Sequence, residues 1–307
     1  MTPMRPVMVA LDGSDKDARA IAVGMAVARL SESALHFVRV IPDPVHVARV
    51  AAAGLLYDVD AEQAAGRASL ESATATANAV PGRTSSAALL QAKDVAAALM
   101  QHATERGALV IVMATRAPGG VSRALLGSVA DQITRESSHP VVLVPPGAAY
   151  LAGKDPSVAR VLVPLDDSSL SFRSLEFLIE LPKATDLSYA LVEVVDQDWK
   201  LKPAEARLAA SAEWLRSRGA RAVEAAVLLA PDPAAAIVGA VRDALPNMIV
   251  MSTRGAGGLG RLVLGSVAQG VVRGSELPVL LLTPRVLASM PSTSREEPAA
   301  PASRSSP

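Results

Sequence analysis

An internal repeat restricts the fold of this chain more than any other feature of its sequence. Residues 123–146 and 261–284 are identical at 12 of 24 positions without a gap. The starts of the two halves also match, because MVALDGS (8–14) and VLVPLDDS (161–168) are both apolar runs that end in aspartate and serine. A repeat on this scale predicts two similar domains in tandem.

The two halves differ in length at one place. Asp12 lies 154 residues before Asp166, whereas Gly127 lies only 138 residues before Gly265. The first half therefore carries about sixteen extra residues, which fall between its second strand and Gly127. We expect them within residues 42–66, as a longer loop and helix start.

Each half reads as alternating strands and helices. Strands such as LVIVM and MIVMS are continuous apolar runs, as expected when helices cover both faces of a parallel sheet. In the first half we expect strands at 7–11, 35–41, 84–91, 108–115 and 140–145, and helices at 15–30, 61–79, 93–107 and 129–138. Five strands per half predict an α/β fold of two tandem, doubly wound, five-stranded parallel-sheet domains.

The domain boundaries follow from composition. The Gly-, Pro- and Ala-rich stretch 147–159 divides the halves, so we place the domains at 1–147 and 157–286. Residues 287–307 are rich in Pro, Ser and Ala without a period, and we expect them to form a disordered tail.

Composition excludes several classes of function. Lys+Arg and Asp+Glu both number 30, so the chain lacks the positive field of a nucleic-acid-binding protein. It has no cysteine, which excludes disulfides, thiolate metal sites and cysteine nucleophiles. No apolar run reaches the ~20 residues of a membrane helix, and the N-terminus lacks the apolar core of a signal peptide. We expect a cytoplasmic protein with no nucleic-acid or membrane partner.

Catalytic and metal-binding patterns are equally scarce. The chain contains no G-x-S-x-G motif, and Asp166–Asp167 reads better as a helix-start pair than as paired catalytic carboxylates. The histidines show no metal-ligand spacing; they are His36, His46, His102 and His139. We expect no catalytic residue and no metal site within the protein itself.

The stretch STRGAGGLGRLVLGS (252–266) combines glycines with the end of a strand and the start of a helix. Ligands bind at such places in open α/β sheets, because helix N-termini present free N–H groups and partial positive charge. A dinucleotide-binding turn does not fit. That turn follows the first strand of its βαβ unit, whereas residues 252–266 follow the penultimate strand of the repeat. A P-loop does not fit either, because Arg261 and Leu262 replace the required Lys and Ser/Thr.

The spacing Ser252-x2-Gly255-x9-Gly265-Ser266 resembles the loop of universal stress proteins, whose ATP-binding members show Gly-x2-Gly-x9-Gly-Ser/Thr. The aspartate after strand one, the V-M-S/A-T-R strand end, L-G-S-V-A and the final P-V strand extend the resemblance over essentially the whole chain outside the tail. The chain is similar to tandem universal stress proteins. In the first half Ala114 and a further alanine replace both early glycines.

The resemblance implies roles for matching residues. The aspartate lies at the adenine–ribose end, the strand-two valine touches the base, and Gly265 and Ser266 hold phosphate. Read from the residues alone, the aspartate could also cap a helix, the valine could be core, and the glycine could simply form a turn. The implied nucleotide-binding residues are Pro164, Leu165, Asp166, Val194, Ser252, Arg254, Gly255, Gly265, Ser266 and Val267, with Ala10, Asp12, Val40, Ala114, Gly127, Ser128 and Val129 in the first half.

The resemblance implies a stress-response protein that binds ATP, with Mg²⁺, or another adenine nucleotide, in one or both domains, and acts by conformation or assembly. With no general base evident, hydrolysis would be slow at most, so we expect no enzyme. The alternative is a nucleotide-free interaction or dimerisation module. The halves should pack about a pseudo-two-fold axis through their final strands, and two chains are expected to form a homodimer.

Overall fold

The computed structural model describes residues 5–43, 58–115, 127–151, 157–244, 246–254 and 264–290. Each half contributes five strands within these residues, as the sequence predicts. The strands of the first half are β1 (Val7–Leu11), β2 (Leu35–Ile41), β3 (Ser85–Gln91), β4 (Val110–Ala114) and β5 (Val141–Val144). Those of the second half are β6 (Arg160–Leu165), β7 (Ser188–Val195), β8 (Ala222–Leu229), β9 (Met248–Ser252) and β10 (Val279–Leu282).

Helices connect these strands. The first half contains α1 (Asp17–Leu30), α3 (Val59–Asn78), α4 (Val95–Glu105), α5 (Ser128–Glu136) and the 3-10 turn η1 (Pro146–Leu151). The second half contains α6 (Ser169–Ile179), η2 (Ala184–Asp186), η3 (Asp198–Lys200), α7 (Leu201–Ser217), α8 (Pro233–Ala244), α9 (Ser266–Gly274) and α10 (Pro284–Ser289). The alternation of strand and helix confirms the doubly wound α/β class.

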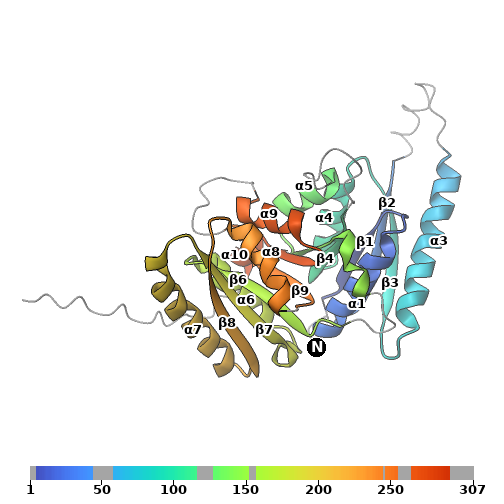
Figure 1. Cartoon of the computed structure of the whole chain (residues 1–307). Helices are drawn as coiled ribbons and strands as arrows, with labels where there is room; N and C mark the ends of the chain where they lie inside the picture. The colour runs from blue at the N-terminus through green and yellow to red at the C-terminus, as the bar shows by residue number, and fades with distance from the viewer. Residues whose placement is uncertain are drawn as a thin grey trace, which may run out of the picture.

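All ten strands form one sheet in the order β3-β2-β1-β4-β5-β10-β9-β6-β7-β8 (Figure 1). The order reads the same from either end when each strand is replaced by its counterpart in the other half. Pairing is parallel within each half, whereas β5 and β10 meet antiparallel, with Val142 opposite Leu280. The predicted packing of the two halves through their final strands is therefore confirmed. The edges of the sheet are β3 and β8.

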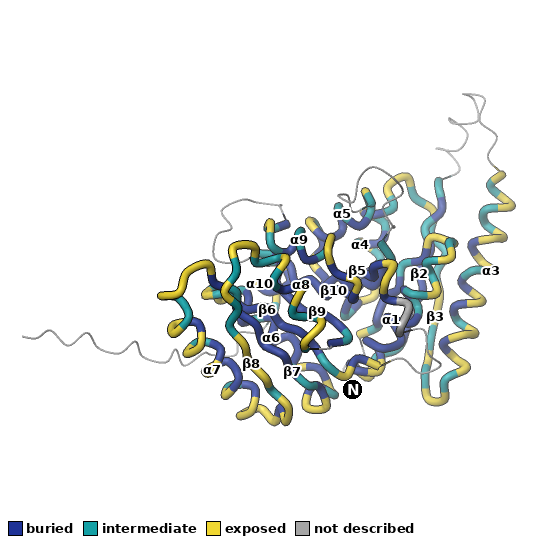
Figure 2. The backbone as a smooth tube through the Cα atoms, viewed as in Figure 1, coloured by how far each residue is buried: buried dark blue, intermediate teal, exposed yellow. Residues whose placement is uncertain are grey.

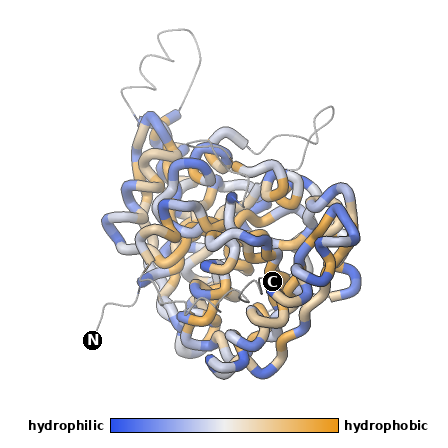
Figure 3. Tube along the Cα trace, turned by 90° about the vertical axis from the view of Figure 1, so that its left-hand side faces the viewer, coloured by the Kyte–Doolittle hydropathy of each residue, from blue (hydrophilic) through white to orange (hydrophobic). Residues whose placement is uncertain are grey.

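Two helical layers bury the sheet. Helices α1, α3, α6, α7 and α10 cover one face, and α4, α5, α8 and α9 cover the other. The central strands are buried throughout, while the exposed residues lie on the outer helices and edge strands (Figure 2). Hydrophobic segments fill the interior and hydrophilic ones occupy the outer turns (Figure 3). The interior is built largely from closely packed Ala, Val and Leu, with a few buried aromatic side chains such as Phe37 and Tyr189.

The extra residues of the first half lie where the sequence placed them. In the second half β7 ends at Val195 and α7 begins at Leu201, whereas β2 ends at Ile41 and α3 begins only at Val59. Residues 44–57 of this connection lie outside the described residues. The longer connection thus leads from the C-terminal end of β2 into α3.

The predicted start of the tail at residue 287 is wrong by three residues. Helix α10 continues to Ser289, and the Leu287 side chain is fully buried. Thr283 caps this helix by accepting a hydrogen bond from the Val286 N–H (3.3 Å), and Pro284 occupies its first turn. These two residues are a helix-start signal that the composition-based boundary overlooked. Residues 291–307 lie outside the described residues.

Candidate functional site

The candidate residues gather at the carboxyl edge of the sheet. In the second half β6 lies between β7 and β9, so the chain leaves β6 and β9 towards opposite sides. Such a point forms a crevice in doubly wound folds. Leu165 pairs with Glu193 across β6 and β7, and Leu162 pairs with Ile249 across β6 and β9. The three strand ends that carry the predicted residues are therefore level with one another.

Glycine starts the helix at the phosphate side of both halves. Gly265 is the N-cap of α9 and Gly127 that of α5, and a glycine N-cap supplies no side-chain hydrogen bond to its helix. Five other helices are capped by side chains, those of Asp58, Asp94, Ser168, Asp232 and Thr283, whereas the N-cap residues of α1 and α7 make no such bond. Ser266 and Ser128, the first helical residues, are exposed. The first-turn N–H groups of α5 and α9 are therefore available for an anion.

The two helix starts differ in charge. The first turn of α5 contains Asp131, which pairs with Arg135 at 2.9 Å. The matching residue of α9 is Gln269, and no acidic residue lies in the first turn of that helix. A carboxylate near a helix N-terminus competes with a bound anion for the same partial charge. The second half therefore presents the more favourable anion site.

The backbone is also closer in the second half. The Gly265 N–H donates to the Thr253 carbonyl at 2.8 Å, which ties the start of α9 to the end of β9. A Cβ at Gly265 would lie 2.9 Å from that carbonyl oxygen, whereas a Cβ at Gly127 would meet none of the described residues within 4 Å. Residue 265 must therefore be glycine because the backbone of residue 253 lies so close, whereas no such contact in the described part of the chain restricts the residue type at position 127.

The remaining predicted residues of this loop have mixed outcomes. Ser252 is buried, and its hydroxyl donates to the Arg254 carbonyl at 2.6 Å, so the hydroxyl shapes the turn after β9. Gly255 lies outside the described residues. Val267, like its counterpart Val129, is half-buried against the core beneath the helix start, and Ala114 at the end of β4 is half-buried too.

Asp166 and Asp12 each organise the turn that follows the first strand of their half. Asp166 accepts hydrogen bonds from both the N–H (3.0 Å) and the hydroxyl of Ser168. Asp12 accepts from the Ser14 N–H at 3.0 Å. Ser168 is the N-cap of α6, so the aspartate itself is not the cap. Pro164 and Leu165 are buried behind Asp166, and Ala10 is half-buried behind Asp12.

A cleft of about 420 Å³ opens beside Val194 at the ends of β7 and β8. Its walls come from the β6–α6 turn, the end of β7, the start of α7, Pro231 before α8 and Pro233 at the start of α8. Trp199, 71% exposed, stands at this cleft with the Lys200 ammonium 5.4 Å from its ring centroid. Val194 therefore lies at a solvent-accessible hollow large enough for a flat ring, and its first-half counterpart Val40 is likewise half-buried.

A buried ion pair was missed by sequence reasoning in each half. Arg39 on β2 donates to Glu62 of α3 at 2.6 Å, and Glu193 on β7 accepts from Arg207 of α7. The hydrogen bond to Glu193 raises the pKa of Arg207. Arg39 and Glu193 occupy the same position of the repeat with opposite charge. The sequence signal that could have indicated each pair is a single charged residue within an apolar strand, Arg39 in β2 and Glu193 in β7.

Asp17 is a further residue that the sequence did not single out. Its carboxylate accepts the N–H groups of Asp12 at 3.0 Å and Gly13 at 2.9 Å. Burial raises the pKa of Asp17, an effect that these two N–H donors oppose. Asp17 therefore fixes the turn that carries Asp12.

All four histidines belong to the first half, and the three within the described residues lie away from the carboxyl edge. The Nε2 atoms of His36 and His102 are 2.8 Å apart, and His36 Nδ1 lies 2.7 Å from the Ser86 hydroxyl. Burial lowers the pKa of His36 to about 4. His46 lies outside the described residues, among which no group of three potential metal ligands occurs.

None of the helices in the described parts of the chain is long and apolar enough to span a membrane.

Comparisons with known proteins agree with this architecture. The universal stress protein family model matches residues 3–145 and again 158–283. A universal stress protein of Mycobacterium tuberculosis is 27% identical over 184 residues, covering 56% of this chain and 61% of the relative. The match thus spans less than two thirds of that protein. A universal stress protein of Methanocaldococcus jannaschii is 28% identical over 137 residues, covering 40% of this chain and 81% of the relative.

Among solved structures, a universal stress protein of Archaeoglobus fulgidus resembles this chain with a TM-score of 0.66 at 20% identity. The resemblance covers 91% of this chain and 98% of that structure. At this identity the likeness concerns the fold, and it extends over both halves.

Proposed function

The chain belongs to the universal stress protein family, and from this premise we propose that it binds ATP or another adenine nucleotide in its second half. The start of α9 carries the proposal. Gly265 begins this helix without a side-chain cap, no acidic residue lies in its first turn, and it adjoins the crevice between β6 and β9. Phosphate oxygens would accept hydrogen bonds from the N–H groups of the first turn.

The base and ribose would lie towards the ends of β6 and β7. Asp166 occupies the turn after β6, and Val194 borders the open cleft next to it. The cleft offers an apolar wall from Val194 and an aromatic face from Trp199, both suited to a purine. Mg²⁺ would accompany a triphosphate, held mainly by phosphate oxygens and water.

Binding without rapid turnover fits the chemistry of the site. The residues that begin α9, from Leu264 to Gln269, include no carboxylate, histidine or lysine. Within these residues a nucleotide would meet N–H donors, and none of their side chains is a general base for water. We infer that the protein acts through nucleotide-dependent conformation or assembly, and a homodimer remains part of this proposal.

Isothermal titration calorimetry with Mg·ATP tests the proposal with a matched pair of variants. Ser266→Glu places a carboxylate at the exposed first residue of α9, where it satisfies the helix dipole and repels phosphate. One extra charge about 5 Å from the phosphate costs ~1–3 kcal/mol at effective dielectric constants of 80 to 20, or about a 5- to 150-fold loss of affinity. Ser128→Glu makes the same change at α5 and serves as the control.

The result that contradicts the proposal is an unchanged affinity in Ser266→Glu, or no heat from the wild-type protein. The second result would favour a nucleotide-free interaction module. Such a module has its own support, because Trp199 and Leu229 are large apolar side chains exposed at 71% and 52% on the outer side of the second half.

A further inference from the structure

A side chain fills the base end of the first-half site. Arg39 is 8% exposed, and its guanidinium lies directly over Gly13, in the turn after Asp12. A Cβ built on Gly13 would lie 2.6 Å from Arg39 Cζ, so the two groups are in close contact. Gly13 has a φ of +80°, and a larger residue at this position would be strained as well as crowded.

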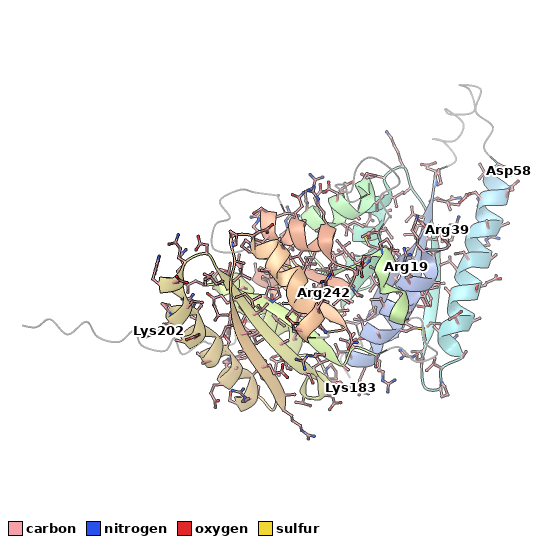
Figure 4. The ribbon with its side chains drawn as sticks, viewed as in Figure 1. Arg19, Arg39, Asp58, Lys183, Lys202 and Arg242 are labelled. Atoms are coloured by element: carbon pink, nitrogen blue, oxygen red, sulfur yellow. The ribbon has the colours of Figure 1, made fainter. Side chains whose placement is uncertain are left out.

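Two acceptors hold the Arg39 side chain in this position. Its Nη2 donates to Glu62 at 2.6 Å, and its Nη1 donates to the Ala65 carbonyl at 3.3 Å. Both acceptors belong to α3, so Arg39 bridges the end of β2 and this helix (Figure 4). An arginine fixed at two atoms by a neighbouring helix is not a freely moving surface side chain.

The corresponding place in the second half borders a cleft. The repeat places Asp167 at the position of Gly13 and Glu193 at that of Arg39. Both residues line the 420 Å³ cleft beside Val194. Glu193 binds Arg207 of α7, whose Nε lies 3.7 Å from Asp167 Oδ1, so a guanidinium borders the turn here as well. The Arg207 side chain is 33% exposed and lines the cleft, whereas Arg39 is buried. One reversal of charge in the repeat thus accompanies a buried guanidinium over the turn in the first half and a cleft-lining one in the second.

We propose that Arg39 is a built-in plug that occupies the base end of the first-half site, so that each chain takes one adenine nucleotide, in the second half. The inference rests on the proposed nucleotide binding of that half. Asp131 in the first turn of α5 adds an independent electrostatic disadvantage to the first half. The tandem repeat therefore contains one working site and one self-occupied site.

The stoichiometry of Mg·ATP binding to the full chain tests the plug. Calorimetry should give one nucleotide per wild-type chain, with affinity lost in Ser266→Glu and kept in Ser128→Glu. Arg39→Ala should raise the stoichiometry to two, and Arg39→Ala combined with Ser266→Glu should return it to one. Arg67→Ala removes an exposed arginine from the same helix α3, and should leave the value at one.

A second variant protects the test against a misfolded Arg39→Ala protein. Glu62→Ala leaves Arg39 in the chain but removes its anchor, and it should admit a second, weaker nucleotide. Two nucleotides on the wild-type chain, or one on chains in which Arg39→Ala and Glu62→Ala fold normally, would overturn the plug. Heat from Arg39→Ala alone, with none from the wild type, would sustain the plug and reject the second-half site. No heat of binding from the wild type or from any variant would reject both the plug and the second-half site.

Discussion

The two helix-start glycines should respond differently to the same substitution. Gly265 and Gly127 occupy equivalent positions and have nearly the same backbone angles, with φ of −58° and −57°. Neither angle disfavours alanine, so backbone strain does not distinguish them. Their surroundings do, because an alanine Cβ at residue 265 would lie 2.9 Å from the Thr253 carbonyl oxygen, whereas one at residue 127 would contact nothing within 4 Å in the part of the chain that the structure describes.

The expected magnitudes follow from this difference. Alanine is a poorer N-cap than glycine, which lowers the stability of the folded protein. Replacing glycine also reduces the conformational entropy of the unfolded chain, which raises the stability by ~0.4–1 kcal/mol. Because the two effects oppose each other, Gly127→Ala should change the free energy of unfolding little. In Gly265→Ala the Thr253 carbonyl must move by about half an ångström to restore ordinary contact. Overpacking of this kind costs ~1–3 kcal/mol. The Gly265 N–H bond to the same carbonyl would be strained as well.

Urea unfolding followed by circular dichroism, without nucleotide, measures the difference in the free energy of unfolding. Gly265→Ala should be less stable by ~1–3 kcal/mol, with a melting temperature lower by roughly 2 °C per kcal/mol for a chain of this size. Equal effects of the two substitutions, or a larger effect at Gly127, would refute the reasoning. The experiment also separates loss of structure at Gly265 from loss of nucleotide affinity.

Three other predictions concern the pH response, the junction between the halves and the cleft. Because the folded pKa of His36 is about 4, below its ordinary 6.5, the unfolded chain binds a proton that the folded chain does not between these values. The free energy of unfolding should therefore fall by up to ~3 kcal/mol as pH falls from 6.5 to 4. When this free energy is measured by urea titration at each pH, its decrease with falling pH should be smaller in His36→Gln than in the wild type. The same pH dependence in both proteins would contradict this prediction. Val142→Asp places a charge opposite Leu280 in the β5–β10 pair and should cost at least ~3 kcal/mol in the same assay, unless the halves are joined mainly by other contacts. Trp199 is the exposed tryptophan at the cleft, so Mg·ATP should change the fluorescence of the wild type but not that of Trp199→Phe; an equal change in both would assign the signal to Trp214.

The sequence by itself determined the architecture of this protein. The repeat and the apolar runs predicted ten strands in two equivalent sets, and the matching final strands predicted how the halves meet. The position of the extra first-half residues also followed from spacing alone. These features depend on periodicity and local preference, which each stretch of chain carries in its own residues.

Tertiary structure alone decided how the two halves differ at the candidate site. Arg39 fills its half because Glu62 and Ala65 hold its guanidinium over Gly13, and both belong to a helix that 17 residues separate from β2. Gly265 is required because the Thr253 carbonyl approaches it. Both facts depend on distances between elements that are separated in the chain, and no local pattern encodes such distances. A repeated motif therefore predicts two similar sites, but packing between elements decides which of them is open.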